Sequence, residues 1–186
     1  MIGDVVDAYC LSRFGKSLGI AAQSTIASEL RLARKIVADF AAIAPTTWLA
    51  GNHEDRFRKR MEELPFLAPY APDPFAALAK KAGAAYVPRG YLLERQRLIC
   101  HGEHGGWPVR AEAKARKLGV AVLEGHTHQL RLDWLSSGWY ALECGHLVDP
   151  RAPVFEYSAG ARDGLGAWCP GFSWIGRDGI PRIERL

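Results

Sequence analysis

The chain has 186 residues, of which 48% are hydrophobic and 24% charged, the balance of an ordinary soluble globular protein. Its four cysteines include no C-x-x-C pair, which argues against a zinc knuckle and a disulfide framework. With no signal peptide and no long apolar span, we expect a cytoplasmic protein without a membrane partner. The net charge of +4 suits an anionic substrate, and the length predicts a single domain over residues 1–186.

Helical and strand patterns alternate through the first two thirds of the chain, and hairpins follow. Apolar residues at helical spacing, among them Leu30, Ala33 and Val37, predict a long helix over 20–44 that Pro45 ends. Further helices are expected at 54–64, 75–82 and 108–118, strands at 46–50, 84–87, 91–94, 97–100, 120–123, 130–135 and 139–144, and a hairpin from 172 onward. A mixed sheet with helices packed on it is the expected architecture.

Four apolar runs end beside a glycine and a polar side chain. They end at Gly3-Asp4, Gly51-Asn52-His53, His101-Gly102 and Gly125-His126-Thr127-His128. Open α/β sheets bind ligands at strand ends, and glycine allows the backbone to turn sharply there. Carboxylate oxygen, amide oxygen and imidazole nitrogen together suit Mn, Fe or Zn. The four runs therefore predict one site built from several strand ends.

Each of these side chains also has a purely structural interpretation. His126 and His128 could belong to a polar loop, His101 could be a hydrogen-bonded histidine of the core, and Asp4 could be part of an N-terminal turn. Four such runs in one chain favour the common site over four unrelated accidents.

The motifs and their order resemble those of the calcineurin-like metallophosphoesterases. The matching stretches are Gly3-Asp4-Val5-Val6-Asp7, Gly51-Asn52-His53-Glu54, His101-Gly102 and Gly125-His126-Thr127-His128. The resemblance implies an α/β fold, a β-sandwich of mixed sheets flanked by helices with the first strand missing. It also implies a site for two divalent metal ions, Mn, Fe or Zn, at the ends of the strands.

The resemblance further implies a role for each matched residue. The metal ligands would be Asp4, Asn52, His101, His126 and His128. Asp4 would bridge both ions, and Asn52, His101 and His126 would be the other ligands of the second ion. His128 would be a ligand of the first ion. His53 would be the catalytic histidine, which hydrogen-bonds the phosphate and assists departure of the leaving group. Glu54 completes its motif without being a usual ligand. For Arg56 and Arg58 a solvated helix face is expected rather than a place near the substrate.

The implied activity is hydrolysis of a phosphate mono- or diester by hydroxide that the metal ions activate. A nucleotide or a nucleic acid is among the phosphate esters that this allows, so that a phosphodiesterase or a nuclease is included. The alternative is a catalytically weak or inactive module of the same fold that binds metal or nucleic acid.

One motif of the family is absent. The family carries Asp-x-His upstream of Gly-Asp, which supplies two ligands of the first metal, but this chain starts at Met1 and contains no Asp-x-His. Three explanations stay open. The true start lies upstream, which we favour; Asp7 or His104 replaces a missing ligand; or the chain binds only one metal ion.

Overall fold

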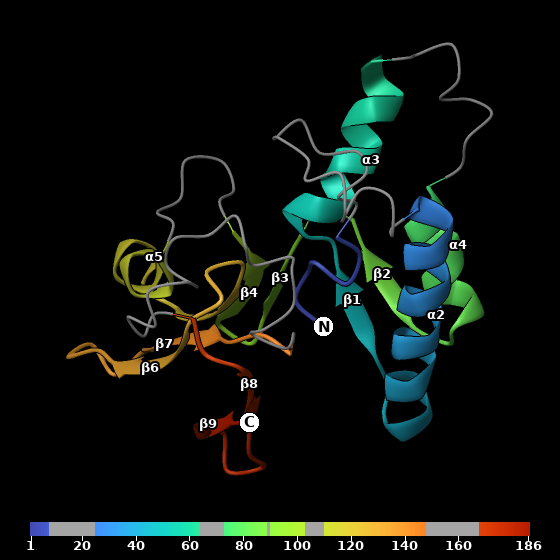
Figure 1. The fold of residues 1–186 in the computed structure, drawn as a ribbon. Helices are drawn as coiled ribbons and strands as arrows, with labels where there is room; N and C mark the ends of the chain where they lie inside the picture. The colour runs from blue at the N-terminus through green and yellow to red at the C-terminus, as the bar shows by residue number, and fades with distance from the viewer. Residues whose placement is uncertain (8–24, 64–72, 89, 103–109, 148–167) are drawn as a thin grey trace. The chain divides into compact units, whose positions relative to one another are not determined.

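The computed structural model describes residues 1–7, 25–63, 73–88, 90–102, 110–147 and 168–186. Over these ranges the chain divides into two compact units, Met1–Tyr91 and Leu92–Leu186. The described elements are helices α2 to α5 and strands β1 to β9, a mixed α/β structure that confirms the expected class (Figure 1). No helix within the described ranges is long and apolar enough to cross a membrane.

Helix α2, Ile26–Ile43, has the apolar face that the sequence predicts. Its N-cap is Thr25, whose side chain accepts from the Ser28 amide at 3.1 Å while Ser28 Oγ accepts from the Thr25 amide at 3.0 Å. This reciprocal capping satisfies two amides that a helix start leaves without a helical partner. Ala33 and Val37 are fully buried. The first five positions of the predicted helix, 20–24, lie outside the described residues.

The core of the first unit forms around a short parallel sheet. β1, Thr47–Leu49, pairs with β2, Ala85–Val87, and Ile2 adds a single parallel bridge to Leu49. Trp48 on β1 is completely buried. Its ring makes edge contacts with Phe75, at 5.8 Å between centroids, and with Tyr86, at 5.3 Å. Phe75 belongs to α4, Pro74–Lys81, which packs beside α2.

Helix α3, Asn52–Glu63, begins two residues earlier than the predicted start at Glu54. The Asp55 amide donates to the Gly51 carbonyl at 3.2 Å, which makes Gly51 the residue that precedes the first turn. A carboxylate oxygen of Glu54 accepts from the Gly51 amide at 2.7 Å. Asn52 and His53 therefore start the helix instead of ending the strand, and their positions are fixed by helical geometry.

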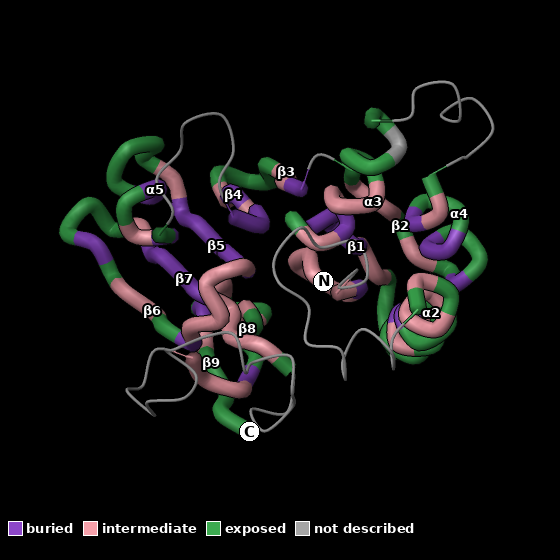
Figure 2. Tube along the Cα trace, turned by 45° about the horizontal axis from the view of Figure 1, so that its top comes forward, coloured by how far each residue is buried: buried purple, intermediate pink, exposed green. Residues whose placement is uncertain are grey.

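The second unit contains a five-stranded mixed sheet in the order β3-β4-β5-β7-β6. Its strands are β3 (Tyr91–Glu94), β4 (Arg97–His101), β5 (Ala121–Gly125), β6 (Leu130–Trp134) and β7 (Tyr140–Cys144). β4, β5 and β7 run parallel, and β6 is antiparallel to β7. Every residue of β5 is buried, as expected for a central parallel strand (Figure 2).

Helix α5, Ala111–Leu118, packs on β5 and β7. Arg110 is its N-cap, and Gly119 ends it with φ of 64°, so that the predicted stop is confirmed. The predicted start at Pro108 lies outside the described residues, as does His104. The remaining strands, β8 (Gly171–Ile175) and β9 (Pro181–Arg185), form the predicted C-terminal hairpin.

Candidate functional site

Asp4 lies on a tight turn that one buried carboxylate holds in place. The backbone of both Gly3 and Asp4 is left-handed, with φ of 67° and 50°. Glu54 accepts three amides from this turn, those of Asp4 at 3.0 Å, Val5 at 2.8 Å and Val6 at 3.0 Å. With the Gly51 amide, four donors meet one carboxylate, and Glu54 is only 1% exposed. Glu54 therefore connects the turn of Asp4 to the junction between β1 and α3.

The electrostatic environment of Glu54 combines two opposing effects. Burial raises the pKa of this carboxyl and the negative charge of Asp4 raises it further, while the amide bonds from Val6 and Gly51 lower it. The structure also explains the glycine at 51. A Cβ there would lie 2.2 Å from Oδ1 of Asp4 and 2.9 Å from Oε2 of Glu54, so that no larger residue fits.

Each ring nitrogen of His53 has a polar side-chain atom within hydrogen-bonding distance. Nδ1 lies 2.8 Å from Oδ1 of Asp7, and Nε2 lies 3.0 Å from Nη2 of Arg56. Nη1 of Arg56 donates to the backbone carbonyl of Asp7 at 2.8 Å. Asp4 is also close, because its Oδ1 accepts from the His53 amide at 3.1 Å and its Oδ2 lies 3.8 Å from Nε2. The N-terminal turn and the first turn of α3 thus form one polar network.

Two expectations from the sequence change with this network. Asp7, considered above as a replacement for a missing metal ligand, is the partner of His53. Arg56, expected on a solvated helix face, is turned inward with only 21% of its side chain exposed. Arg58 does match that expectation, with 54% exposure and a 2.9 Å contact to Asp55 on its own helix. Asp7 lies three residues after Asp4, and that spacing is the only sequence signal for its role.

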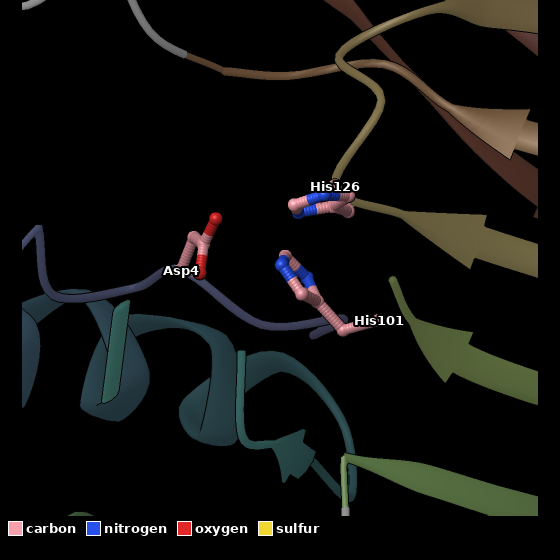
Figure 3. Close-up of side chains that lie close together, drawn as sticks. All are labelled: Asp4, His101 and His126. Carbon is pink, nitrogen blue, oxygen red and sulfur yellow. The ribbon is translucent and has the colours of Figure 1, made fainter. Parts of the chain in front are cut away.

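In the second unit, His101 and His126 come together at the ends of adjacent parallel strands. His101 is the last residue of β4 and is paired in register with Gly125, the last residue of β5. The two imidazoles meet edge to face with centroids 5.2 Å apart, and each offers a ring nitrogen within 4.8 Å of the other. Figure 3 shows both rings where they leave the two strands, and it labels Asp4 of the first unit as well.

The backbone of this second unit is shaped to permit the close approach. His126 has φ of 77° and Gly102 has φ of 70°. A Cβ on residue 102 would come within 3.2 Å of Cγ of His126, so that glycine at this position leaves room for the ring. The left-handed conformation of His126 costs about 1 kcal/mol or more for a residue that is not glycine, and such a cost is typical of functional positions.

The neighbours of His128 differ from those of His126. Its backbone is also left-handed, with φ of 59°. Its ring stacks on Trp168 with centroids 4.5 Å apart and lies 5.6 Å from the ring of His146. Of the three histidines of the second unit that the sequence singles out, the structure therefore brings two together and gives the third aromatic neighbours.

A buried ion pair includes Glu124, the residue that precedes the last position of β5. Lys114 of α5 donates to Glu124 of β5, and neither side chain is exposed. On the paired strands β4 and β5, Glu124 is in register with Cys100, and the next position pairs Gly125 with His101. Burial raises the pKa of Glu124 to about 7, against the effect of Lys114. Burial also raises the pKa of Cys100 to about 12, so that this thiol is protonated at neutral pH in the metal-free chain.

The structural roles of Glu54, Arg56 and Lys114 were not predicted. The motif marks the position of Glu54 but not its role. One of its four amide donors is three residues away in the sequence, and the other three are 48 to 50 residues away. Lys114 falls among the polar residues of an amphipathic helix, and nothing in its spacing marks it as buried.

No protein-family model matches the chain, and no curated protein sequence matches it either. Among solved structures, the chain is similar to wild-type Vps29 complexed with Zn²⁺ from Entamoeba histolytica. The two share 19% identity over 57% of this chain and 71% of that chain, with a TM-score of 0.30.

Proposed function

We propose that residues 1–186 are a single metallophosphoesterase-like domain with a β-sandwich fold, and that it hydrolyses a phosphate mono- or diester with the help of a divalent metal ion. The observation that carries this proposal is the pair of His101 and His126. Their imidazoles leave neighbouring parallel strand ends and offer nitrogens within 4.8 Å of one another, an arrangement that fits one metal ion.

The donor chemistry supports a divalent transition metal. Two imidazole nitrogens suit Mn, Fe or Zn, and a carboxylate oxygen and an amide oxygen complete a mixed set. We propose Asp4 and Asn52 as those further ligands, and His128 as a ligand of a second ion. The buried Glu124, whose charge interacts with His101, would add negative charge near a cation held by that histidine, and Lys114 limits what burying this charge costs.

A metal ion at this place would polarise a phosphoryl oxygen and lower the pKa of a water molecule bound to it. The residues of the chain would do the rest. Glu54 fixes the turn that presents Asp4, and Asp7 fixes the ring of His53 through Nδ1. Nε2 of His53 is then the atom that can act on the phosphate and on the departing oxygen.

A metal-binding module without activity is the second candidate. One observation favours it. Asp7 could replace a ligand of the first metal, but its Oδ1 lies 2.8 Å from Nδ1 of His53 and is engaged there. Within the described part of the chain, the donors that we propose are sufficient for one ion but few for two. Such a module would bind a single metal ion.

The test is elemental analysis of protein purified without chelator, with hydrolysis of bis(p-nitrophenyl) phosphate measured on the same sample under added Mn²⁺. We expect bound metal and turnover in the wild type, and loss of both in His126→Ala. His53→Ala should reduce turnover much more than metal content, because His53 is proposed to act on the substrate. Metal without turnover would favour the module, and turnover unchanged in His126→Ala would refute the proposed site.

A further inference from the structure

Arg56 differs from the other arginines of its helix in where its guanidinium lies. It follows His53 by three residues, which is one turn of α3, so that the two side chains share a face. Its Nη1 donates to the Asp7 carbonyl at 2.8 Å and its Nη2 lies 3.0 Å from Nε2 of His53. Arg58 is 54% exposed and pairs with Asp55. Of these two arginines, only Arg56 contacts His53, the proposed catalytic residue.

This contact fixes which ring nitrogen of His53 carries the proton. A guanidinium has five N–H donors and no acceptor, so Nε2 must accept and cannot itself bear a hydrogen. The ring proton is then on Nδ1, which lies 2.8 Å from Oδ1 of Asp7, a carboxylate oxygen that can accept it. A neutral imidazole with this tautomer satisfies both contacts at once, and the reverse tautomer satisfies neither.

The consequence concerns an incoming phosphate. Nε2 is the atom that we propose to act on the substrate, yet in the free protein it has no proton to donate and is already bonded to Arg56. A phosphate oxygen that reached this place would meet the N–H groups of the guanidinium first. Guanidinium N–H groups bind phosphate oxygens in strong, charge-assisted bonds with defined geometry.

We infer that Arg56 is the phosphoryl-binding residue of the site, and that a phosphate oxygen takes the Nη2–H that Nε2 of His53 accepts in the free protein. This inference rests on the proposed function. The bond from Nη1 to the Asp7 carbonyl stays in place, so that Arg56 changes one partner while its other bond anchors it. The exchange releases the lone pair of Nε2 of His53, which can then take up a proton from water and donate that proton to the ester oxygen of the leaving group.

The surrounding charges make this exchange depend on metal. Asp4 and Asp7 both present carboxylates to the same network, with Oδ2 of Asp4 3.8 Å from Nε2 of His53. Two carboxylates repel a phosphate unless a cation offsets one of them. We therefore expect inorganic phosphate to bind to metal-loaded protein and to bind much more weakly to metal-free protein.

The first experiment uses metal-free protein and no substrate. Long-range ¹H–¹⁵N NMR of the His53 ring at about pH 8, where an ordinary imidazole is neutral, should show Nδ1 protonated and Nε2 as a hydrogen-bonded acceptor. In Arg56→Ala the Nε2 resonance should move to that of an acceptor without the guanidinium, and in Arg58→Ala, the matched control on the same helix, it should not move. A proton found on Nε2 in the wild type would overturn the inference.

The second experiment measures binding of inorganic phosphate to Mn²⁺-loaded protein by titration calorimetry, with metal content checked on each sample. Arg56→Ala should weaken phosphate binding roughly 10- to 100-fold, while Arg58→Ala stays within about twofold because exposed charges contribute little. Arg56→Lys keeps the charge without the planar fork and should be intermediate.

The outcomes separate this inference from the proposed function. If metal-loaded wild type binds phosphate through Arg56 but shows no turnover, the proposed catalysis fails and the inference stands. If wild type loaded with metal does not bind phosphate, or if Arg56→Ala binds it as tightly as wild type does, the inference is wrong whatever the turnover.

Discussion

Single side chains determine the geometry of the first unit's polar network. Glu54 is the clearest case, because one carboxylate accepts four backbone amides and holds a left-handed turn that would otherwise be strained. Oε1 serves Val5 and Val6, while Oε2 serves Asp4 and Gly51. Replacement of a buried carboxylate that accepts four amides should lower the stability of the fold, because each amide would be left without a hydrogen-bond partner and without access to water.

Glu54→Gln should therefore destabilise the chain although it changes only one atom. The amide nitrogen of glutamine is a donor, so that two backbone N–H groups would face another N–H group. We expect a loss of about 2–4 kcal/mol in the free energy of unfolding, measured by urea denaturation. Glu62→Gln, on the same helix with 68% of its side chain exposed, is the matched control and should change stability little. Equal stability of the two variants would contradict the role given to Glu54.

At the scale of elements, the ion pair between α5 and β5 sets how the helix packs beside the strand that leads to His126. Lys114 and Glu124 are both fully buried. Removing one partner of such a pair leaves the other as an unpaired charge in the core, whereas removing both together leaves a nonpolar contact. The pair thus connects the two elements more through the cost of breaking it than through a large gain from forming it.

Lys114→Met should destabilise the chain by about 3–5 kcal/mol at pH 8, because Glu124 must then either keep its charge without a partner or be protonated far above the ordinary pKa of a carboxyl. The effect should be smaller at pH 5. Burial already raises the pKa of Glu124 from 4.5 to about 7, and a carboxyl with a raised pKa loses stability as pH rises from its unfolded value through its folded value. Denaturation of Lys114→Met, Lys114→Met/Glu124→Met and the exposed control Lys117→Met at both pH values tests this. The double variant should recover most of the loss, and a single variant that is equally destabilised at both pH values would contradict it.

The elements themselves were largely predictable, and the site was predictable in part. Strands such as β1 and β5 are short apolar runs bounded by proline or glycine, which is a local signal. The start of α3 was missed by two residues because a side chain within the helix, Glu54, determines it through Gly51. The inward turn of Arg56 was also missed, since its partner Asp7 is 49 residues away and helical periodicity does not register such a contact.

At the scale of the whole molecule, metal binding should be visible in the stability of the protein. His101 and His126, which carry the proposed site, belong to the unit Leu92–Leu186. A ligand that binds only the folded state stabilises the part that contributes to its site. Binding of metal should therefore raise the unfolding temperature of this unit.

Calorimetric unfolding with and without Mn²⁺ tests this effect. At a free metal concentration of about 100 times the dissociation constant, the gain in stability should be about 2.7 kcal/mol. His126→Ala should abolish this gain, and Asp4→Asn should reduce it, because Asp4 is proposed as a further ligand. A gain that is unchanged in His126→Ala would contradict binding of the ion at this pair of histidines.

The burial of Trp48 has a practical consequence for spectroscopy. Of the chain's six tryptophans, Trp48 is the only one in residues 1–91, and its indole is enclosed by the rings of Phe75 and Tyr86. An indole shielded from water emits at shorter wavelength than an exposed one such as Trp134, which is 58% exposed. Replacement of the other five by phenylalanine would leave a chain whose intrinsic fluorescence reports on the first unit alone, with no label added.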